Sequence, residues 1–229
     1  MHTIVCNSSQ INTVIFDLDG TIADTNEIIL RTMAETLEHA SGRPWPRELL
    51  MPNWGMRLRD QMQLLYPEIN LDRAVPFYRR RYAELHETLL AEFPGVRPML
   101  QTLASQNIVL GVVTSKKRDS AQKTLCGLGY AHFFTTVVVE EDTSRHKPSP
   151  EPILYALERL RAPATQTIYV GDNPDDIHAA HAAGIGAVAV GWALRPRAEL
   201  SAARPEAIID TPGELLTLLD AGAVAAARA

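Results

Sequence analysis

The sequence predicts an α/β protein with a doubly wound, Rossmann-like parallel sheet and an all-helical module inserted into it. Three observations support this prediction. Short apolar runs alternate with amphipathic stretches, as in proteins whose parallel strands are joined by helices. The runs are apolar throughout, which is typical of strands buried on both faces. The connection after the first run is far longer than a crossover helix requires.

Six apolar runs are the expected strands, and each leads into a polar residue or a glycine. The runs are 14–16, 108–113, 137–139, 167–170, 187–190 and 207–209, and they are followed by Asp17, Thr114, Glu140, Gly171, Gly191 and Asp210. Parallel strands present their carboxyl ends at one edge of a sheet, and ligands bind at that edge. We therefore expect a site there.

Helical stretches fill the intervals between the later strands. Residues 98–106, 119–129 and 150–160 carry apolar side chains at spacings of three and four. Ser149 followed by Pro150 predicts a helix N-cap and first helical residue, and Gly184 predicts a helix stop. We expect Cys126 to be a buried, reduced thiol.

The long connection after the first strand predicts a separate module. Residues 25–41, 56–66 and 72–90 read as amphipathic helices. We therefore expect a core domain at 1–21 and 94–229 and a helical cap domain at 22–93. An insertion beside the strand ends is placed to cover the site as a lid. The alternative is that it only thickens the core.

Composition excludes several classes of function. The chain has 229 residues and a formal net charge of −5, so no basic surface for nucleic acid is expected. The N-terminus has neither a basic start nor a long apolar stretch, and residues 182–194 are too few to span a bilayer. Two distant cysteines are typical of reduced thiols. We expect a cytoplasmic protein, monomer or homodimer, without a membrane or nucleic-acid partner.

Two groups of acids follow expected strands. Asp17 and Asp19 follow the first, and the stretch GDNPDD at 171–176 supplies Asp172, Asp175 and Asp176. Carboxylates crowded at one sheet edge need a compensating cation, and Mg²⁺ suits a site made of oxygen ligands. A calcium-binding loop does not fit, because the glycine in DLDG stands fourth rather than sixth.

The first pair of acids, Asp17 and Asp19, predicts two separate roles in catalysis. A carboxylate at the end of a strand can attack, while another two residues on moves protons. Lys147, in the proline-rich stretch KPSPEP, is the candidate compensating cation. Thr114 and Ser115 end the second strand and offer hydroxyl and backbone N–H donors to an oxyanion.

The ordered set DLDGT, VVTS, KP and GDNPDD resembles the four motifs of the haloacid dehalogenase superfamily in its phosphatase branch. The resemblance covers essentially the whole chain, and the inserted helices match the family's type-1 helical cap. It implies an aspartyl-phosphate mechanism, with Asp17 as nucleophile and Asp19 as general acid and base. It also implies that Thr114 and Lys147 hold the transferring phosphoryl group.

The same resemblance implies a Mg²⁺ site. Its ligands would be a carboxylate oxygen of Asp17, the backbone carbonyl of Asp19 and a carboxylate oxygen of Asp172, with Asn173 and Asp176 in support. Asp19 favours phosphoryl transfer over dehalogenation, because a departing halide needs no proton.

The local details are most similar to bacterial inorganic pyrophosphatases of this superfamily, and phosphoglycolate phosphatases are nearly as similar. DTNEII at 24–29 and GDNPDDI at 171–177 are among the shared stretches. A phosphomutase resembling β-phosphoglucomutase and a phospho-ligand sensor without turnover stay open as alternatives. The substrate-binding residues that we expect are Gly20, Thr21, Ser115, Lys116 and Arg57.

The cap offers a candidate specificity loop at 53–57, NWGMR. Gly55 would permit a close backbone approach to substrate, and Arg57 either contacts substrate or lies on the surface. Cations such as Lys116 and Arg59 suit a compact polyanion. We expect the run at 79–81, three arginines, to be solvated.

Overall fold

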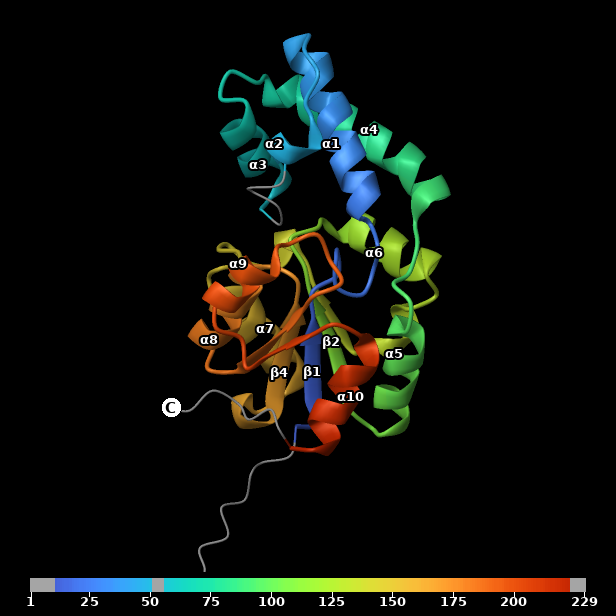
Figure 1. The fold of residues 1–229 in the computed structure, drawn as a ribbon, viewed down its shortest axis with the longest axis vertical. Helices are drawn as coiled ribbons and strands as arrows, with labels where there is room; N and C mark the ends of the chain where they lie inside the picture. Colours follow the sequence, from blue (N-terminus) through green and yellow to red (C-terminus); the bar gives the residue numbers. More distant parts are fainter. Residues whose placement is uncertain (1–10, 51–55, 223–229) are drawn as a thin grey trace, which may run out of the picture.

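The computed structural model describes residues 11–50 and 56–222. Its centre is a six-stranded, all-parallel sheet in the order β3-β2-β1-β4-β5-β6 (Figure 1). The strands are β1 (Thr13–Phe16), β2 (Val109–Val113), β3 (Thr136–Val138), β4 (Thr167–Gly171), β5 (Gly186–Val190) and β6 (Ala207–Ile209). The predicted doubly wound sheet is confirmed. The strand order reverses between β1 and β4, where such sheets bind ligands.

Helices cover both faces of the sheet because alternate strand residues point to opposite sides. Val14 and Phe16 pack in one apolar cluster with α5 (Val96–Ser105), α6 (Arg118–Gly127) and α10 (Pro212–Asp220). Ile15 packs in another with α7 (Glu151–Leu160), α8 (Pro174–Ala182) and α9 (Arg197–Ala202). Short 3₁₀ turns complete the connections at η2 (Ala131–Phe133), η3 (Glu140–Asp142) and η4 (Ala164–Gln166).

Two local predictions are wrong and one is confirmed. Pro150, not Ser149, is the N-cap of α7, which begins one residue later than expected. Cys126 is exposed, because it lies on the outer side of α6. Gly184 has φ +75° and follows the end of α8, as expected of a glycine stop.

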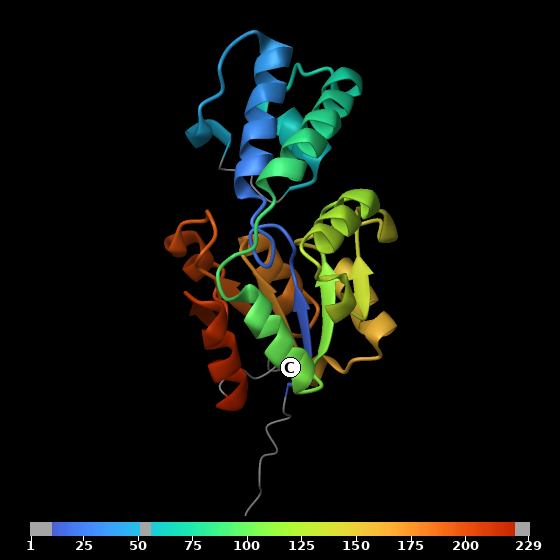
Figure 2. The ribbon, with the colours of Figure 1, turned by 90° about the vertical axis from the view of Figure 1, so that its right-hand side faces the viewer.

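Among the described residues between β1 and α5, four helices form a body with its own apolar cluster. They are α1 (Asn26–Ser41), α2 (Arg47–Leu50), α3 (Leu58–Leu65) and α4 (Leu71–Leu89). Figures 1 and 2 show this body beyond the carboxyl ends of the strands, joined to the sheet by two adjacent linkers. The Asp24 amide donates to the Ala91 carbonyl at 3.0 Å across those linkers. The domain boundaries at 21/22 and 93/94 stay a prediction.

Within residues 11–50 and 56–222, no helix combines the length and the apolar character needed to cross a membrane.

Candidate active site

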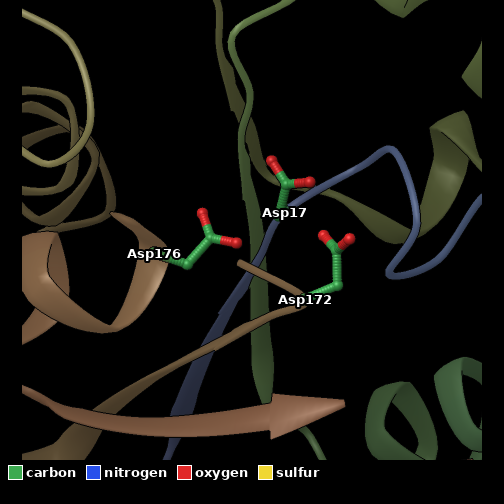
Figure 3. Close-up of side chains that lie close together, drawn as sticks. All are labelled: Asp17, Asp172 and Asp176. Carbon is green, nitrogen blue, oxygen red and sulfur yellow. The ribbon is translucent and has the colours of Figure 1, made fainter. Parts of the chain in front are cut away.

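The ends of β1 and β4 bring the predicted acids together. These strands pair in register, with Phe16 opposite Val170, so the residues that follow them lie side by side. The Asp17 amide still donates to the Val170 carbonyl at 2.8 Å, which fixes the backbone just beyond the strand. Figure 3 shows the side chains of Asp17, Asp172 and Asp176 lying close together. One oxygen from each lies within 4.8 Å of the other two.

Lys147 is the cation of this cluster. Its Nζ donates to Asp17 Oδ1 and to Asp176 Oδ1, both at 2.6 Å, and to the Tyr169 hydroxyl at 3.1 Å. Burial works against the ammonium, but Asp17 and Asp176 outweigh burial and hold the pKa of Lys147 well above its usual value. Lys147 is therefore charged, and it ties the first and fourth motifs together.

One lysine does not balance three carboxylates. Burial, reinforced by the charges of Asp176 and Asp19 against the opposing effect of Lys147, raises the pKa of Asp17 to about 7. Burial is also the main reason that the pKa of Asp172 is raised, with the charge of Asp17 second. The Oδ2 atom of Asp172 is buried and has no partner among the described residues. An oxygen-only, electron-rich cluster with an unsatisfied buried acceptor fits a hard divalent cation such as Mg²⁺.

The start of α8 explains how Asp176 is held. Asn173 is the N-cap, and its side chain accepts a hydrogen bond from the Asp175 amide at 3.1 Å. Asp176 Oδ2 accepts in return from the Asn173 amide at 3.1 Å, which completes a capping box. The other carboxylate oxygen of Asp176 is left for Lys147. Asn173 and Asp176 thus support the cluster through a helix cap.

Gly20 and Thr21 contact Asp172. Gly20 has φ +79°, and a Cβ at this position would lie 2.4 Å from Asp172 Oδ2, so a side chain there would displace the acid. The Thr21 hydroxyl donates to Asp172 Oδ1 at 3.3 Å. Neither residue lines the cavity described below. Both residues therefore help to position the side chain of Asp172. Their expected role in substrate binding stays a prediction.

Asp19 lies at the junction with the cap. Its Oδ1 accepts hydrogen bonds from Lys116 Nζ at 2.6 Å and from the Thr25 hydroxyl. Lys116 Nζ also donates to the Tyr82 hydroxyl of α4 at 2.9 Å. The candidate acid and base is therefore connected to the cap through one lysine. Sequence reasoning missed both Thr25 and Tyr82; Thr25 lies in the quoted stretch DTNEII, whereas Tyr82 carries no sequence signal.

A cavity of about 860 Å³ separates the acids from the cap. Its core wall includes Asp17, Asp19, Thr114, Lys147 and Asp172, as well as Ser115, Lys116, Asn173 and Asp176. The predicted core residues are thus brought together, apart from Gly20 and Thr21. The Thr114 amide donates to the Val138 carbonyl at 3.0 Å, and its hydroxyl accepts from the Lys116 amide at 3.2 Å.

The cap wall differs in part from the sequence prediction. Arg57 does not line the cavity; it forms an ion pair with Asp60 at 2.6 Å, and 41% of its side chain is exposed. Arg59 lines the cavity instead; Arg79 also lines it, and it is exposed, as expected. Most of the proposed specificity loop, including Gly55, lies outside the described residues.

Comparisons with known proteins agree with this geometry. A family model described as haloacid dehalogenase-like hydrolase matches residues 14–190. A Bacillus mycoides protein named pyrophosphatase PpaX is 37% identical, covering 92% of this chain and 97% of that protein. A solved haloacid dehalogenase-like hydrolase from Streptococcus pneumoniae is 26% identical with a TM-score of 0.79, covering 90% of this chain and 97% of that one.

A second solved structure shares the fold. It comes from Lactobacillus plantarum and is provisionally named as a phosphoglycolate phosphatase. Its TM-score is 0.82 at 23% identity, and the match covers 91% of this chain and 99% of that one.

Proposed function

The chain belongs to the family of haloacid dehalogenase-like hydrolases, and from this premise we propose that it is a Mg²⁺-dependent phosphohydrolase acting on inorganic pyrophosphate. The observation that carries the proposal is the convergence of Asp17, Asp172 and Asp176 around Lys147 at the carboxyl ends of β1 and β4. A cytoplasmic location, expected from the sequence, is part of the same proposal.

In this proposal Asp17 is the nucleophile. Its carboxylate attacks phosphorus, and the bond to the leaving oxygen breaks as an aspartyl-phosphate forms. Lys147, 2.6 Å from Asp17, and Thr114, on the same cavity wall, stabilise the charge that develops on the phosphoryl oxygens. Asp17, Asp172 and the backbone carbonyl of Asp19 would hold Mg²⁺, which when bound neutralises charge on the carboxylates and on the phosphoryl group.

Asp19 moves the protons. It donates a proton to the leaving oxygen in the first step. In the second step it takes a proton from water, which attacks the aspartyl-phosphate and releases phosphate. Lys116 and Thr25 hold the carboxylate of Asp19 beside the cavity for both steps. The two acids thus divide attack and proton transfer between them.

Pyrophosphate is favoured by the relative named as a pyrophosphatase and by the cations on the cavity walls, which include Lys116, Arg59 and Arg79. Guanidinium and ammonium groups pair well with a compact polyanion. The cavity of about 860 Å³ has room for a larger substrate. This favours a small phosphorylated metabolite such as phosphoglycolate as the second candidate.

Phosphate release tests the proposal. Pyrophosphate, phosphoglycolate, a sugar phosphate and a nucleotide are compared, with Mg²⁺ and with a chelator. We expect the highest kcat/KM on pyrophosphate, loss of activity with chelator, and a fall in kcat of about 10⁴-fold or more in Asp17→Asn. Equal, slow release from all four substrates would leave only a generic phosphatase. Activity retained in Asp17→Asn would place the nucleophile elsewhere.

A further inference from the structure

Gln61 is a buried cap side chain whose amide nitrogen has no acceptor. It lies in α3, only 4% of the residue is exposed, and Nε2 donates to no described residue. An unpaired buried amide destabilises a fold, so such groups need an explanation. Gln61 also lines the cavity that separates the cap from the acids. An acceptor that arrives with a ligand would satisfy the amide.

Gln63 on the same helix shows what an amide side chain with a partner looks like. Gln63, two residues further along the same helix, is exposed, and its Nε2 donates to the Pro67 carbonyl at 2.5 Å. Met62, between them, is fully buried in the apolar cluster of the cap. A glutamine that is buried beside Met62 and has no partner for its amide nitrogen points to a role in binding.

The leaving group of a substrate must lie near the cap. Asp19, which protonates it in the proposed reaction, is joined to α4 through Lys116 and Tyr82. Tyr78, one turn earlier on α4, is buried, lines the same cavity and forms no hydrogen bond with any described residue. The cap wall of the cavity thus carries two donors, on Gln61 and Tyr78, without acceptors among the described residues.

We propose that Gln61 is a specificity-determining residue that donates a hydrogen bond from its side-chain amide to an oxygen of the leaving group. The site then selects leaving groups that carry acceptor oxygens of their own, such as phosphate or a short carboxylate. This inference rests on the proposed phosphohydrolase function. It adds a residue that recognises the leaving group of the substrate.

The test compares wild type with Gln61→Leu on pyrophosphate and on phenyl phosphate, whose leaving group has no oxygen beyond the bridging one. We expect kcat/KM on pyrophosphate to fall about tenfold, which corresponds to about 1.4 kcal/mol, and kcat/KM on phenyl phosphate to change less than about twofold. Gln63→Leu is the matched control and should leave both values unchanged. An equal effect of Gln61→Leu on both substrates, or none on either, overturns the inference.

Two further measurements separate this inference from the proposed function. Binding of methylenediphosphonate and of phenylphosphonate is measured by calorimetry with Mg²⁺, and needs no turnover. Gln61→Leu should weaken only the diphosphonate. If wild type releases phosphate from neither substrate, the proposed function fails, whereas the two affinities still decide the role of Gln61. The melting temperature of Gln61→Leu should equal or exceed that of wild type; a lower one would make Gln61 structural and overturn the inference.

Discussion

The two walls of the cavity are built in different ways. On the core wall, the buried carboxylates of Asp17 and Asp176 each accept a hydrogen bond from Lys147 Nζ at 2.6 Å. On the cap wall, Gln61 and Tyr78 make no side-chain hydrogen bonds with the described residues, and Arg59 is more than half exposed. The difference teaches that the core wall is organised before substrate arrives, as charge stabilisation requires. The cap wall leaves two donors, the Gln61 amide and the Tyr78 hydroxyl, without acceptors among the described residues.

Removing Lys147 should have the largest effect, because the variant breaks the preorganised wall. Lys147→Met takes the partner from Asp17 and from Asp176, and breaking a buried pair in this way costs about 3–5 kcal/mol. We expect kcat to fall about 10³-fold, since one group that stabilises the transferring phosphoryl is lost. Steady-state kinetics and thermal unfolding measure the two losses.

Mg²⁺ sharpens this prediction. Without the lysine the three carboxylates repel one another more strongly, so a cation that binds only the folded state should raise the melting temperature of Lys147→Met more than that of wild type. Activity near the wild-type level in Lys147→Met would show that the two walls do not differ in the way described.

Removing one hydroxyl from the cap wall should have a smaller effect. Tyr82→Phe deletes the acceptor of the 2.9 Å hydrogen bond from Lys116, while the ring stays in place 4.7 Å from the ammonium. We expect KM for pyrophosphate to rise about fivefold, a loss of about 1 kcal/mol, with kcat changed less than about twofold. Steady-state kinetics of the purified variants provide the measurement.

Tyr66→Phe is the matched control for Tyr82→Phe. Its ring packs against Trp45 within the cap, and Tyr66 does not line the cavity, so its kinetics should match wild type. A fall in kcat of about 100-fold in Tyr82→Phe, as expected for a residue that takes part in the chemistry, would contradict the contrast between the walls.

The smallest effect is expected in the scaffold of the cap. Glu35 of α1 accepts hydrogen bonds from Arg81 and Arg31, and the bond from Arg81 is the main cause that lowers the pKa of Glu35 below 4.5. Because the folded state favours the charged form, this stabilisation is present above pH 4.5 and is lost as pH falls through the lowered pKa. Glu35→Gln should lower the melting temperature by a few degrees at pH 7.

The pH profile is the decisive measurement for Glu35→Gln. The difference in melting temperature from wild type should shrink below pH 4.5 and should also shrink at high salt, which screens exposed pairs. Glu48→Gln in α2 is the control, since Glu48 forms no ion pair with any described residue. A difference that stays constant from pH 7 to pH 3 would mean that packing, and not charge, holds α1 to α4.

The core wall could be predicted because its geometry follows from short-range patterns. Asp17 directly follows one apolar run and Asp172 follows another after a single glycine, and parallel pairing of those runs is enough to place both acids at one edge. Asp176 follows from the helix cap that Asn173 begins. No contact beyond neighbouring strands and one helix turn is needed.

The cap wall could not be predicted in the same way. Arg57 and Arg59 differ by two residues, which is more than half a helical turn, so an error of one or two residues at the start of α3 decides which one meets the cavity. The helix begins at Leu58 rather than at the expected residue 56. Tyr82 of α4 meets Lys116, which follows β2, in a contact between residues 34 positions apart in the sequence.

The linkers between core and cap have a consequence for how such a chain can change over evolutionary time. The backbone leaves the sheet region at Asp24 and returns at Ala91, and one hydrogen bond of 3.0 Å spans the exit and the return. Segments whose ends meet can be lengthened, shortened or exchanged at little entropic cost to the rest of the molecule. A different helical segment can thus replace the cap between these two positions. The catalytic core would then act on new substrates while its strands stay unchanged.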